Sequence, residues 1–373
     1  MAIEGTISGT RSPARPSRPP NRTRRARETP LTTRRPDRHH VLLPLVGLAL
    51  TIVGCTEGVA TPRALPSIGG SPTAASAETS TLPSAAAPSA AAPSAAVVLE
   101  GRLLFSRFDE ATHTFTGMFV SRPDGSAETE VPLPFVEGDG AWSRSGSEIA
   151  VATQLADKRI GTAIISTDGT VLRVLEIPDP TLNLPCGVWS IDDARLWCEG
   201  WDDADPSRAG TYTVRASDGG DLQRLTTPPE GMKDLQGDYS AAGQVVFKRY
   251  AGDEGDGPLM LVDASGGEPW PLSSNSFSDP GRFSPDGASI LTSVDYRIVI
   301  LDLDGKVVQT VAEPGANLFG PVWSPDGTRI AFSRGVGGPF ADLFTSLPDG
   351  TDRQQVTQTP ANEINVDWGV GGG

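Results

Sequence analysis

The sequence predicts an all-β protein whose folded part is a six-bladed β-propeller of four-stranded blades, and three observations support this fold class. An aromatic-led turn motif recurs through residues 99–373 with a period close to that of a propeller blade. Short runs of β-branched and aromatic residues alternate there with Asp-Gly and Gly-Gly turns, without a helical apolar stripe. The last copy of the motif is truncated, and the first strand of the domain can complete it. We therefore expect a signal peptide at 1–55, a disordered linker at 56–98 and the propeller at 99–373.

Residues 1–55 have the composition of an export signal. Ten Arg and three acidic residues precede Val41–Gly54, an apolar block of 14 residues. A membrane-spanning helix needs about 20 residues, so a cleaved signal peptide fits this block better. Cys55 follows Ile52–Gly54 in a sequence that resembles the bacterial lipobox, and we expect a lipid on Cys55 to anchor the protein to the membrane. An ordinary signal peptide with an incidental cysteine is the alternative. The sequence does not distinguish export by the Sec system from export by the twin-arginine system.

The linker at 56–98 consists almost entirely of Ala, Pro, Ser, Thr and Gly. Such a segment has too few large apolar groups to offset its ordering entropy. A flexible chain of this length has a typical reach of roughly 35 Å. We therefore expect it to hold the propeller clear of the membrane, on the extracytoplasmic side.

The charge balance excludes one class of partner. The whole chain carries a net charge of −15, and without residues 1–55 it keeps 21 basic and 43 acidic residues, a net charge near −22. A chain this acidic repels phosphate backbones and anionic lipid, which argues against a nucleic-acid partner and leaves the lipid on Cys55 as the membrane tether.

The repeat motif is clearest at Phe283–Gly287 and Trp323–Gly327, which both read aromatic-Ser-Pro-Asp-Gly and precede an apolar run. Degenerate copies begin at Trp142, Trp189 and Tyr239, and a sixth aromatic is Trp368. Successive aromatic residues are 47, 50, 44, 40 and 45 positions apart. Each copy also contains a second pair of extended runs around an Asp-Gly or Gly-Gly turn, so one repeat supplies the four strands of a blade.

The chain ends predict how the ring closes. Arg102–Arg107 matches Arg329–Arg334, which is the second strand of the repeat that begins at Trp323. The domain therefore starts at the second strand of a blade. The strand that ends at Trp368 then completes this blade as its first strand. Such closure removes the exposed sheet edges of an open array.

These motifs resemble the TolB-like, WD-like propeller repeat over essentially all of residues 99–373. The resemblance implies a β-propeller protein of the bacterial envelope. Proteins of that family carry an additional α/β domain ahead of the propeller, whereas in this chain the linker occupies that place.

Cys186 and Cys198 form an even pair in a domain expected to lie outside the cytoplasm, where disulfides persist. We expect a disulfide between them. Two buried thiols are the alternative, because sequence spacing alone does not determine their geometry.

The sequence offers little for catalysis. His113 is the one histidine outside the signal region, and no Gly-x-Ser-x-Gly elbow is present. A single imidazole cannot form a zinc or iron cluster, and the aspartates of the Asp-Gly turns have a structural use. We expect neither a metal nor another cofactor, and we favour a protein that is not an enzyme. A hydrolase or lyase that acts on a glycan or peptide through carboxylates at the central channel is the alternative.

The irregular connections point to a binding face. In the predicted blade order they all lie on the face opposite the tight turns, and they comprise Phe108–Thr116, Glu199–Ala209, Tyr250–Gly257 and Gly335–Ala341. The candidate binding residues form an acidic rim with one aromatic: Trp201, Asp202, Asp203, Asp205, Asp253, Glu254 and Asp256. Such a rim suits a cationic protein or peptide, while solvated loop charge is the alternative. We expect a monomer that binds an envelope or extracellular protein through this face.

Overall fold

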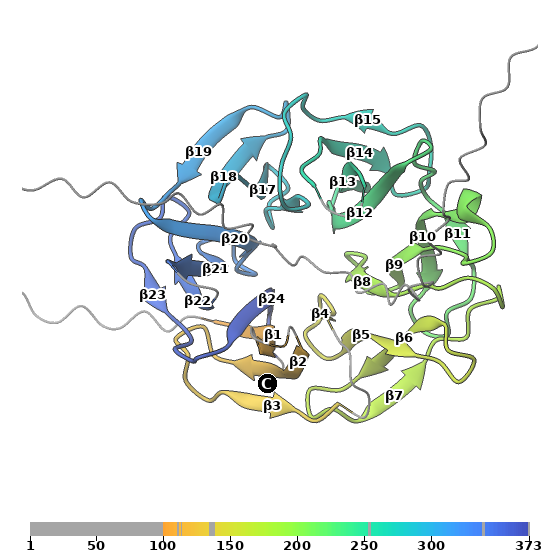
Figure 1. Ribbon diagram of the computed structural model, residues 1–373, viewed down its shortest axis with the longest axis horizontal. Helices are drawn as coiled ribbons and strands as arrows, with labels where there is room; N and C mark the ends of the chain where they lie inside the picture. The colour runs from red at the N-terminus through yellow and green to blue at the C-terminus, as the bar shows by residue number, and fades with distance from the viewer. Residues whose placement is uncertain are drawn as a thin grey trace, which may run out of the picture. The chain divides into compact units, whose positions relative to one another are not determined.

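A computed structural model of the protein describes residues 100–109, 112, 114–133, 139–252, 255–337 and 340–371. The predicted signal peptide with Cys55, the predicted linker and His113 lie outside the described residues. Six antiparallel sheets of four strands each surround a common centre (Figure 1), so the predicted six-bladed β-propeller is confirmed. A single 3₁₀ turn, η1 (Pro206–Arg208), accompanies the strands in this part of the chain.

The four strands of each blade follow one another from the innermost to the outermost. Blade 1 contains β24 (Asn362–Gly369), β1 (Arg102–Asp109), β2 (Thr114–Ser121) and β3 (Thr129–Val131). Blade 2 contains β4 (Gly140–Trp142), β5 (Ile149–Gln154), β6 (Ile160–Ile165) and β7 (Val171–Val174). Blade 3 contains β8 (Cys186–Trp189), β9 (Arg195–Gly200), β10 (Gly210–Arg215) and β11 (Gln223–Arg224).

The remaining three blades follow the same order. Blade 4 contains β12 (Met232–Tyr239), β13 (Gln244–Ala251), β14 (Leu259–Asp263) and β15 (Trp270–Pro271). Blade 5 contains β16 (Arg282–Phe283), β17 (Ser289–Val294), β18 (Arg297–Asp302) and β19 (Val307–Val311). Blade 6 contains β20 (Ala316–Trp323), β21 (Ile330–Val336), β22 (Ala341–Ser346) and β23 (Gln354–Gln355).

The hydrophobic core lies between neighbouring blades. The middle strands of each blade read as unbroken apolar runs, such as Ile149–Val151 in β5, because both faces of the sheet are covered. One core cluster joins Ile164 of blade 2 to Trp189 and Leu196 of blade 3. Since each blade buries its surface against the next, the ring is stable only when every blade has both neighbours.

The two ends of the propeller domain meet in blade 1, as predicted. Strands β1 and β24 pair in antiparallel register, with Leu103 opposite Trp368. Arg107 Nε donates to Glu363 Oε1 at 2.7 Å across this pair, and Glu363 is fully buried. The closing strands therefore share both a hydrogen-bond ladder and a buried ion pair.

Strand order assigns the connections to two faces. The turn face carries the connections between first and second strands and between third and fourth strands; the loop face carries the others. On the turn face, Asp326 accepts hydrogen bonds from the Ser324 hydroxyl at 2.7 Å and from Thr328 N at 3.0 Å. Asp286 makes the same contacts in blade 5, as tight turns of this sequence require. Glu100 O accepts from Trp368 Nε1, so the described chain enters the propeller on the turn face.

Candidate binding face

The loop face carries connections of unequal length. The connection between β17 and β18 consists of Asp295 and Tyr296 alone, whereas Trp201–Ala209 joins β9 to β10. Asp295 and Tyr296 both have positive φ, as a two-residue hairpin turn demands. The blades are thus alike on the turn face and different on the loop face, which is the pattern expected of a binding surface on a rigid scaffold.

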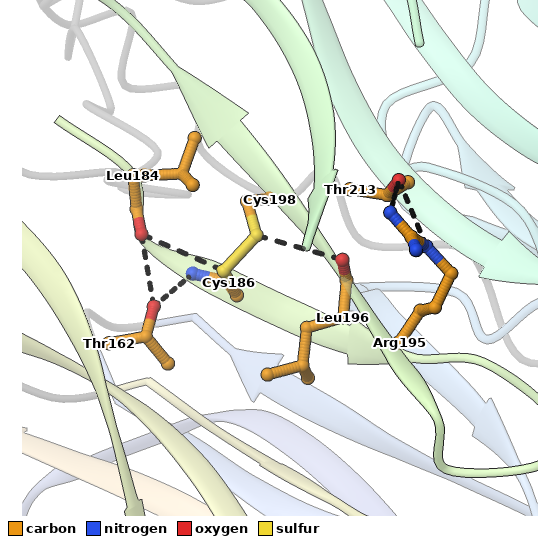
Figure 2. Close-up of a disulfide and its surroundings, with 7 residues drawn as sticks. All are labelled: Thr162, Leu184, Cys186, Arg195, Leu196, Cys198 and Thr213. Atoms are coloured by element: carbon orange, nitrogen blue, oxygen red, sulfur yellow. Dashed lines mark hydrogen bonds between the residues drawn. A yellow bond between two sulfur atoms is a disulfide. The ribbon is translucent and has the colours of Figure 1, made fainter. Parts of the chain in front are cut away.

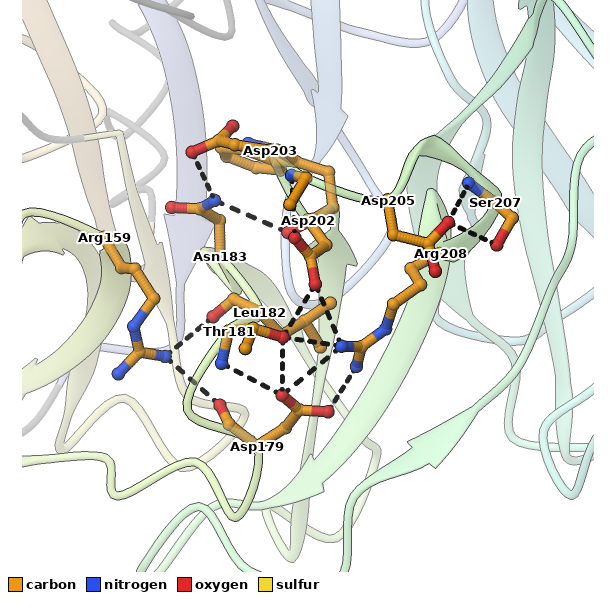
Figure 3. Close-up of polar contacts among 12 residues, drawn as sticks. Arg159, Asp179, Thr181, Leu182, Asn183, Asp202, Asp203, Asp205, Ser207 and Arg208 are labelled. Atoms are coloured by element: carbon orange, nitrogen blue, oxygen red, sulfur yellow. Dashed lines mark hydrogen bonds and ion pairs between the residues drawn. The ribbon is translucent and has the colours of Figure 1, made fainter.

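Among the described connections between second and third strands, Trp201–Ala209 is the longest, and side-chain hydrogen bonds hold it in place (Figure 3). Asp202 accepts from the Thr181 hydroxyl at 2.7 Å and from Arg208 Nη1 at 3.1 Å. Asp205 caps η1 by accepting from Ser207 N at 3.1 Å. Arg208 also donates to Asp179 in the preceding connection between blades, so this connection and the loop form one unit.

These contacts change the protonation of the loop carboxylates. The Arg208 guanidinium lowers the pKa of Asp179 to about 2. Hydrogen bonding, first from the Thr181 hydroxyl, lowers the pKa of Asp202 as well. Both groups are charged at neutral pH, but their charges are directed at Arg208 and Thr181 rather than at solvent.

The structure therefore divides the predicted acidic rim. Asp202 is half-buried and bonded within the loop, and Trp201 is half-buried. Asp205 is exposed but accepts from Ser207, and Asp203 is exposed with one long contact of 3.5 Å to Asn183 Nδ2. Asp256 is exposed on the next blade. Asp253 and Glu254 lie outside the described residues. The rim as a site for a cationic partner stays a prediction.

Two carboxylates that sequence reasoning missed lie at the loop-face ends of inner strands. Asp139 immediately precedes β4, and burial raises its pKa to about 6, opposed by hydrogen bonds from Asn365 and Ser106. Glu199 lies near the end of β9, where burial raises its pKa and the charge of Lys233 partly opposes this. Nothing in the sequence motif marks them, because their surroundings come from other blades.

At the turn-face end, Arg144 connects three blades. It occupies the proline position of the turn motif in blade 2, and its Nη2 donates to Trp189 O of blade 3 at 3.2 Å and to Asp238 of blade 4. Asp238 also accepts from Phe283 N of blade 5 at 3.1 Å. These contacts tie four consecutive blades together around the axis.

The two cysteines of the propeller are joined by a disulfide (Figure 2). Cys186 of β8 and Cys198 of β9 face each other across neighbouring strands and are almost completely buried. The bond crosslinks the two strands directly before the Trp201–Ala209 loop leaves the blade.

Among the described residues, no group of three or more His, Cys, Asp and Glu side chains could hold a metal ion. The same part of the chain contains no helix that is long and apolar enough to cross a membrane.

Comparison with known proteins indicates a likeness to TolB. No family model matches the chain. The Tol-Pal system protein TolB of Anaeromyxobacter dehalogenans strain 2CP-C is 31% identical over 116 residues, which is 30% of this chain and 26% of that protein. The matched region is therefore about a quarter of the length of that relative.

Solved structures show the same fold at low identity. TolB from Acinetobacter baumannii superposes with a TM-score of 0.55 at 18% identity and covers 72% of this chain and 66% of that one. A structure assigned to TolB of Agrobacterium tumefaciens gives 0.51 at 13% identity and covers 72% and 98%, respectively. The propeller is thus TolB-like in fold, as the sequence motifs predict.

Proposed function

We propose that this protein is a lipid-anchored, extracytoplasmic β-propeller that binds an envelope or extracellular protein through its loop face. The observation that carries the proposal is the difference between the faces: the turn face carries short turns of similar length, and the loop face carries loops of unequal length held by side-chain hydrogen bonds. The likeness to a protein of the Tol-Pal system supports a place in the envelope.

The first described residue lies on the other face. Glu100 is on the turn face, opposite the loops that we propose to bind the partner. A monomer is sufficient for this arrangement, because blade 1 closes the ring within one chain.

Site-directed photo-crosslinking in intact cells tests the proposal. A crosslinking amino acid at Asp203 samples the loop face, and the matched control at Asp326 samples the turn face; both replace exposed aspartates. We expect one discrete protein adduct from position 203 and none from position 326. Adducts from position 326 alone, or the same adducts from both, would contradict the loop face as the binding surface.

A hydrolase or lyase acting on a glycan or peptide is a second candidate, favoured by the raised pKa values of Asp139 and Glu199. A carboxyl group whose pKa is raised toward neutral pH is a better general acid than an ordinary one. Turnover of a cell-wall glycan or peptide by the wild-type protein, lost in both Asp139→Asn and Glu199→Gln, would support this function; retention by both variants would exclude these two residues as its catalytic groups.

A further inference from the structure

The surface where blade 3 packs against blade 4, which we call seam 3/4, differs from other seams at the motif aromatic. In blades 2, 3, 5 and 6 this residue donates a hydrogen bond to the preceding blade, either from its backbone N or from its indole. The pairs are Trp142 N with Asp367 Oδ2, Trp189 Nε1 with Ala141 O, Phe283 N with Asp238 Oδ2, and Trp323 Nε1 with Arg282 O. A directional contact therefore joins each of these blades to the one before it.

Tyr239 has the same position in blade 4, and no hydrogen bond from it to blade 3 is present among the described residues. Its backbone N donates at 2.8 Å to the side chain of Asp238, the residue beside it. Its hydroxyl is buried and has no partner within the described ranges. The residue before Trp189 in blade 3 is Val188, whose side chain cannot accept a hydrogen bond. The motif aromatic therefore holds blade 4 to blade 3 by apolar contact.

The interior of seam 3/4 is apolar. Blade 3 contributes Val188, Trp197 and Leu225, and blade 4 contributes Tyr239, Val245, Phe247, Met260 and Val262. Trp197 Nε1, like the Tyr239 hydroxyl, is buried without a partner in the part of the chain that the structure describes. Apolar contact is non-directional, and buried polar groups without partners are costly. Both properties make this seam easier to separate than one that hydrogen bonds cross.

The outer turns show that blades 3 and 4 are also farther apart on the turn face. In the other five blades, a Cβ atom on the glycine between third and fourth strands would lie 2.2–2.9 Å from the preceding blade. These contacts are Gly125 with Val356, Gly169 with Pro132, Gly219 with Glu176, Gly305 with Leu272, and Gly350 with Val311. Gly266 is their counterpart in blade 4, because its N donates to Asp263 O in the same turn, and nothing lies within 4 Å of its Cβ position.

Seam 4/5, on the other side of blade 4, is hydrogen-bonded. The first turn of blade 5 also has a glycine, Gly287, with nothing within 4 Å. Nevertheless Asp238 of blade 4 accepts from Phe283 N, and Arg282 Nη1 of blade 5 donates to Gly237 O at 3.0 Å. Blade 4 is therefore bonded to the blade after it and not, at the equivalent strand, to the blade before it.

Two features limit how seam 3/4 can separate. On the loop face, residues 225–231 connect the blades covalently, and the charge of Lys233 acts on Glu199 across the seam. On the turn face, Arg144 of blade 2 donates both to Trp189 O of blade 3 and to Asp238 of blade 4. The loop-face side can only pivot, whereas the turn-face side is held by one guanidinium that belongs to neither blade.

We propose that seam 3/4 opens on the turn face, with residues 225–231 as the hinge and the Arg144–Asp238 ion pair as the latch. Opening tilts blade 3 against blade 4 and changes the angle at which the Trp201–Ala209 loop stands beside blade 4. Blade 1 keeps the ring closed throughout, because β24 and β1 lie on the opposite side of the ring (Figure 1). The movement is a property of the propeller and does not depend on the identity of any partner.

Native-state thiol labelling of two consecutive valines tests the proposal. Val245 and Val246 of β13 are both fully buried, but Val245 packs in seam 3/4 and Val246 packs against blade 5. Val245→Cys and Val246→Cys are made separately in the Cys55→Ser chain with its disulfide intact, and alkylation by iodoacetamide is followed by mass spectrometry. We expect Val245→Cys to react about tenfold faster or more, because fraying of β13 exposes both positions and opening of the seam exposes only one.

Removal of the latch is the second measurement. Arg144→Leu should speed the labelling of Val245→Cys about tenfold and change that of Val246→Cys by less than about twofold, since it removes a charge-assisted hydrogen bond across one seam. Arg297→Leu is the matched control, because Arg297 pairs with Asp295 within blade 5 and should alter neither rate.

A second pair of positions covers the case in which a β13 variant does not fold. Val262 of β14 packs in seam 3/4, and Val299 of β18 packs in seam 4/5. Val262→Cys should then react faster than Val299→Cys by a similar factor. Equal rates within either pair, or equal acceleration of both positions by Arg144→Leu, would overturn the proposal.

Discussion

Single residues in this propeller are specialised by their neighbours from other blades. Asp139 precedes β4 of blade 2, but its hydrogen-bond donors, Asn365 and Ser106, belong to blade 1. Asp238 of blade 4 holds both Arg144 of blade 2 and Phe283 N of blade 5. Aspartates that look equivalent in the sequence therefore differ in charge and in structural use.

The raised pKa of Asp139 should be detectable in the pH dependence of stability. Its folded-state pKa of about 6 exceeds its ordinary value, so the folded state binds the proton more tightly, and the stability this gives is lost as pH rises from about 4 through 6. Asp139→Asn should therefore gain stability relative to the wild type as pH rises, by about 1 kcal/mol at pH 7.5, since the group is only partly buried. Urea unfolding at pH 4.5 and 7.5 measures this.

Asp349→Asn is the opposite control. Hydrogen bonds from Thr351 lower the pKa of Asp349, so its contribution is present above its ordinary pKa and is lost as pH falls. The variant should lose stability relative to the wild type at pH 7.5 and less so at low pH. A pH-independent difference for Asp139→Asn would exclude a raised pKa at that residue.

At the scale of elements, the disulfide and the ion pairs hold the ends of strands that carry long loops. Cys186–Cys198 joins β8 to β9 directly before Trp201–Ala209, and Arg249 pairs with Asp234 between β12 and β13, where the next long loop begins. The loops of the loop face therefore differ in length, while the strand ends that carry them are held by covalent or ionic links. The tight turns need no such support, because their own Ser and Asp side chains satisfy their backbone.

Removal of the disulfide should be costly. The bond closes a loop with a sequence separation of 12, for which chain-entropy arguments give about 3 kcal/mol. We expect Cys186→Ala/Cys198→Ala to lower the free energy of unfolding by about 2–3 kcal/mol in urea titrations. The wild type unfolded with and without reductant is the control, and equal stability of its oxidised and reduced forms would contradict the prediction.

At the scale of the whole molecule, stability depends on ring closure. Strand β24 brings Ile364, Val366 and Trp368 into the core of blade 1 and pairs with β1 along its length. Burial of three large apolar side chains contributes about 5 kcal/mol or more, which is comparable to the net stability of a typical domain. An open ring would also expose the edge of β1 to other chains.

Deletion of residues 362–373 should therefore abolish cooperative unfolding or cause aggregation, as followed by circular dichroism and size-exclusion chromatography. The matched control, deletion of 371–373 only, leaves β24 intact and should behave as the full chain. A synthetic peptide of residues 362–371 should restore the truncated protein. A monomeric truncated protein with unchanged unfolding would show that closure is dispensable.

The proposed membrane anchor is also a property of the whole chain. Cys55→Ser removes the acceptor of the lipid, so we expect the protein to move from the membrane fraction to the soluble extracytoplasmic fraction. Cys186→Ser is a control for loss of a cysteine as such and should leave the protein with the membrane. Membrane association of Cys55→Ser equal to that of the wild type would refute lipid anchoring at this position.

The sequence by itself determined the number of blades, the four-stranded repeat and the closure of the ring. These follow from local chemistry: Ser-Pro-Asp-Gly and Asp-Gly segments form tight turns wherever they occur, and their period of 40–50 residues matches one blade. The pairing of Arg102–Arg107 with the strand ending at Trp368 followed from the same repeat. The structure confirms all three.

Only the tertiary structure decided which charged and polar side chains are free to contact a partner and which are already hydrogen-bonded or buried. In the sequence, Asp202 and Asp205 look equivalent to Asp203. In the structure, Thr181 and Arg208 donate hydrogen bonds to Asp202, and Ser207 donates to Asp205. Asp139 and Glu199 face groups from neighbouring blades, Asn365 and Ser106 of blade 1 for Asp139 and Lys233 of blade 4 for Glu199. Turn preferences depend on a few consecutive residues, so the sequence reveals them. Burial and hydrogen bonding between neighbouring blades arise only when the ring has closed.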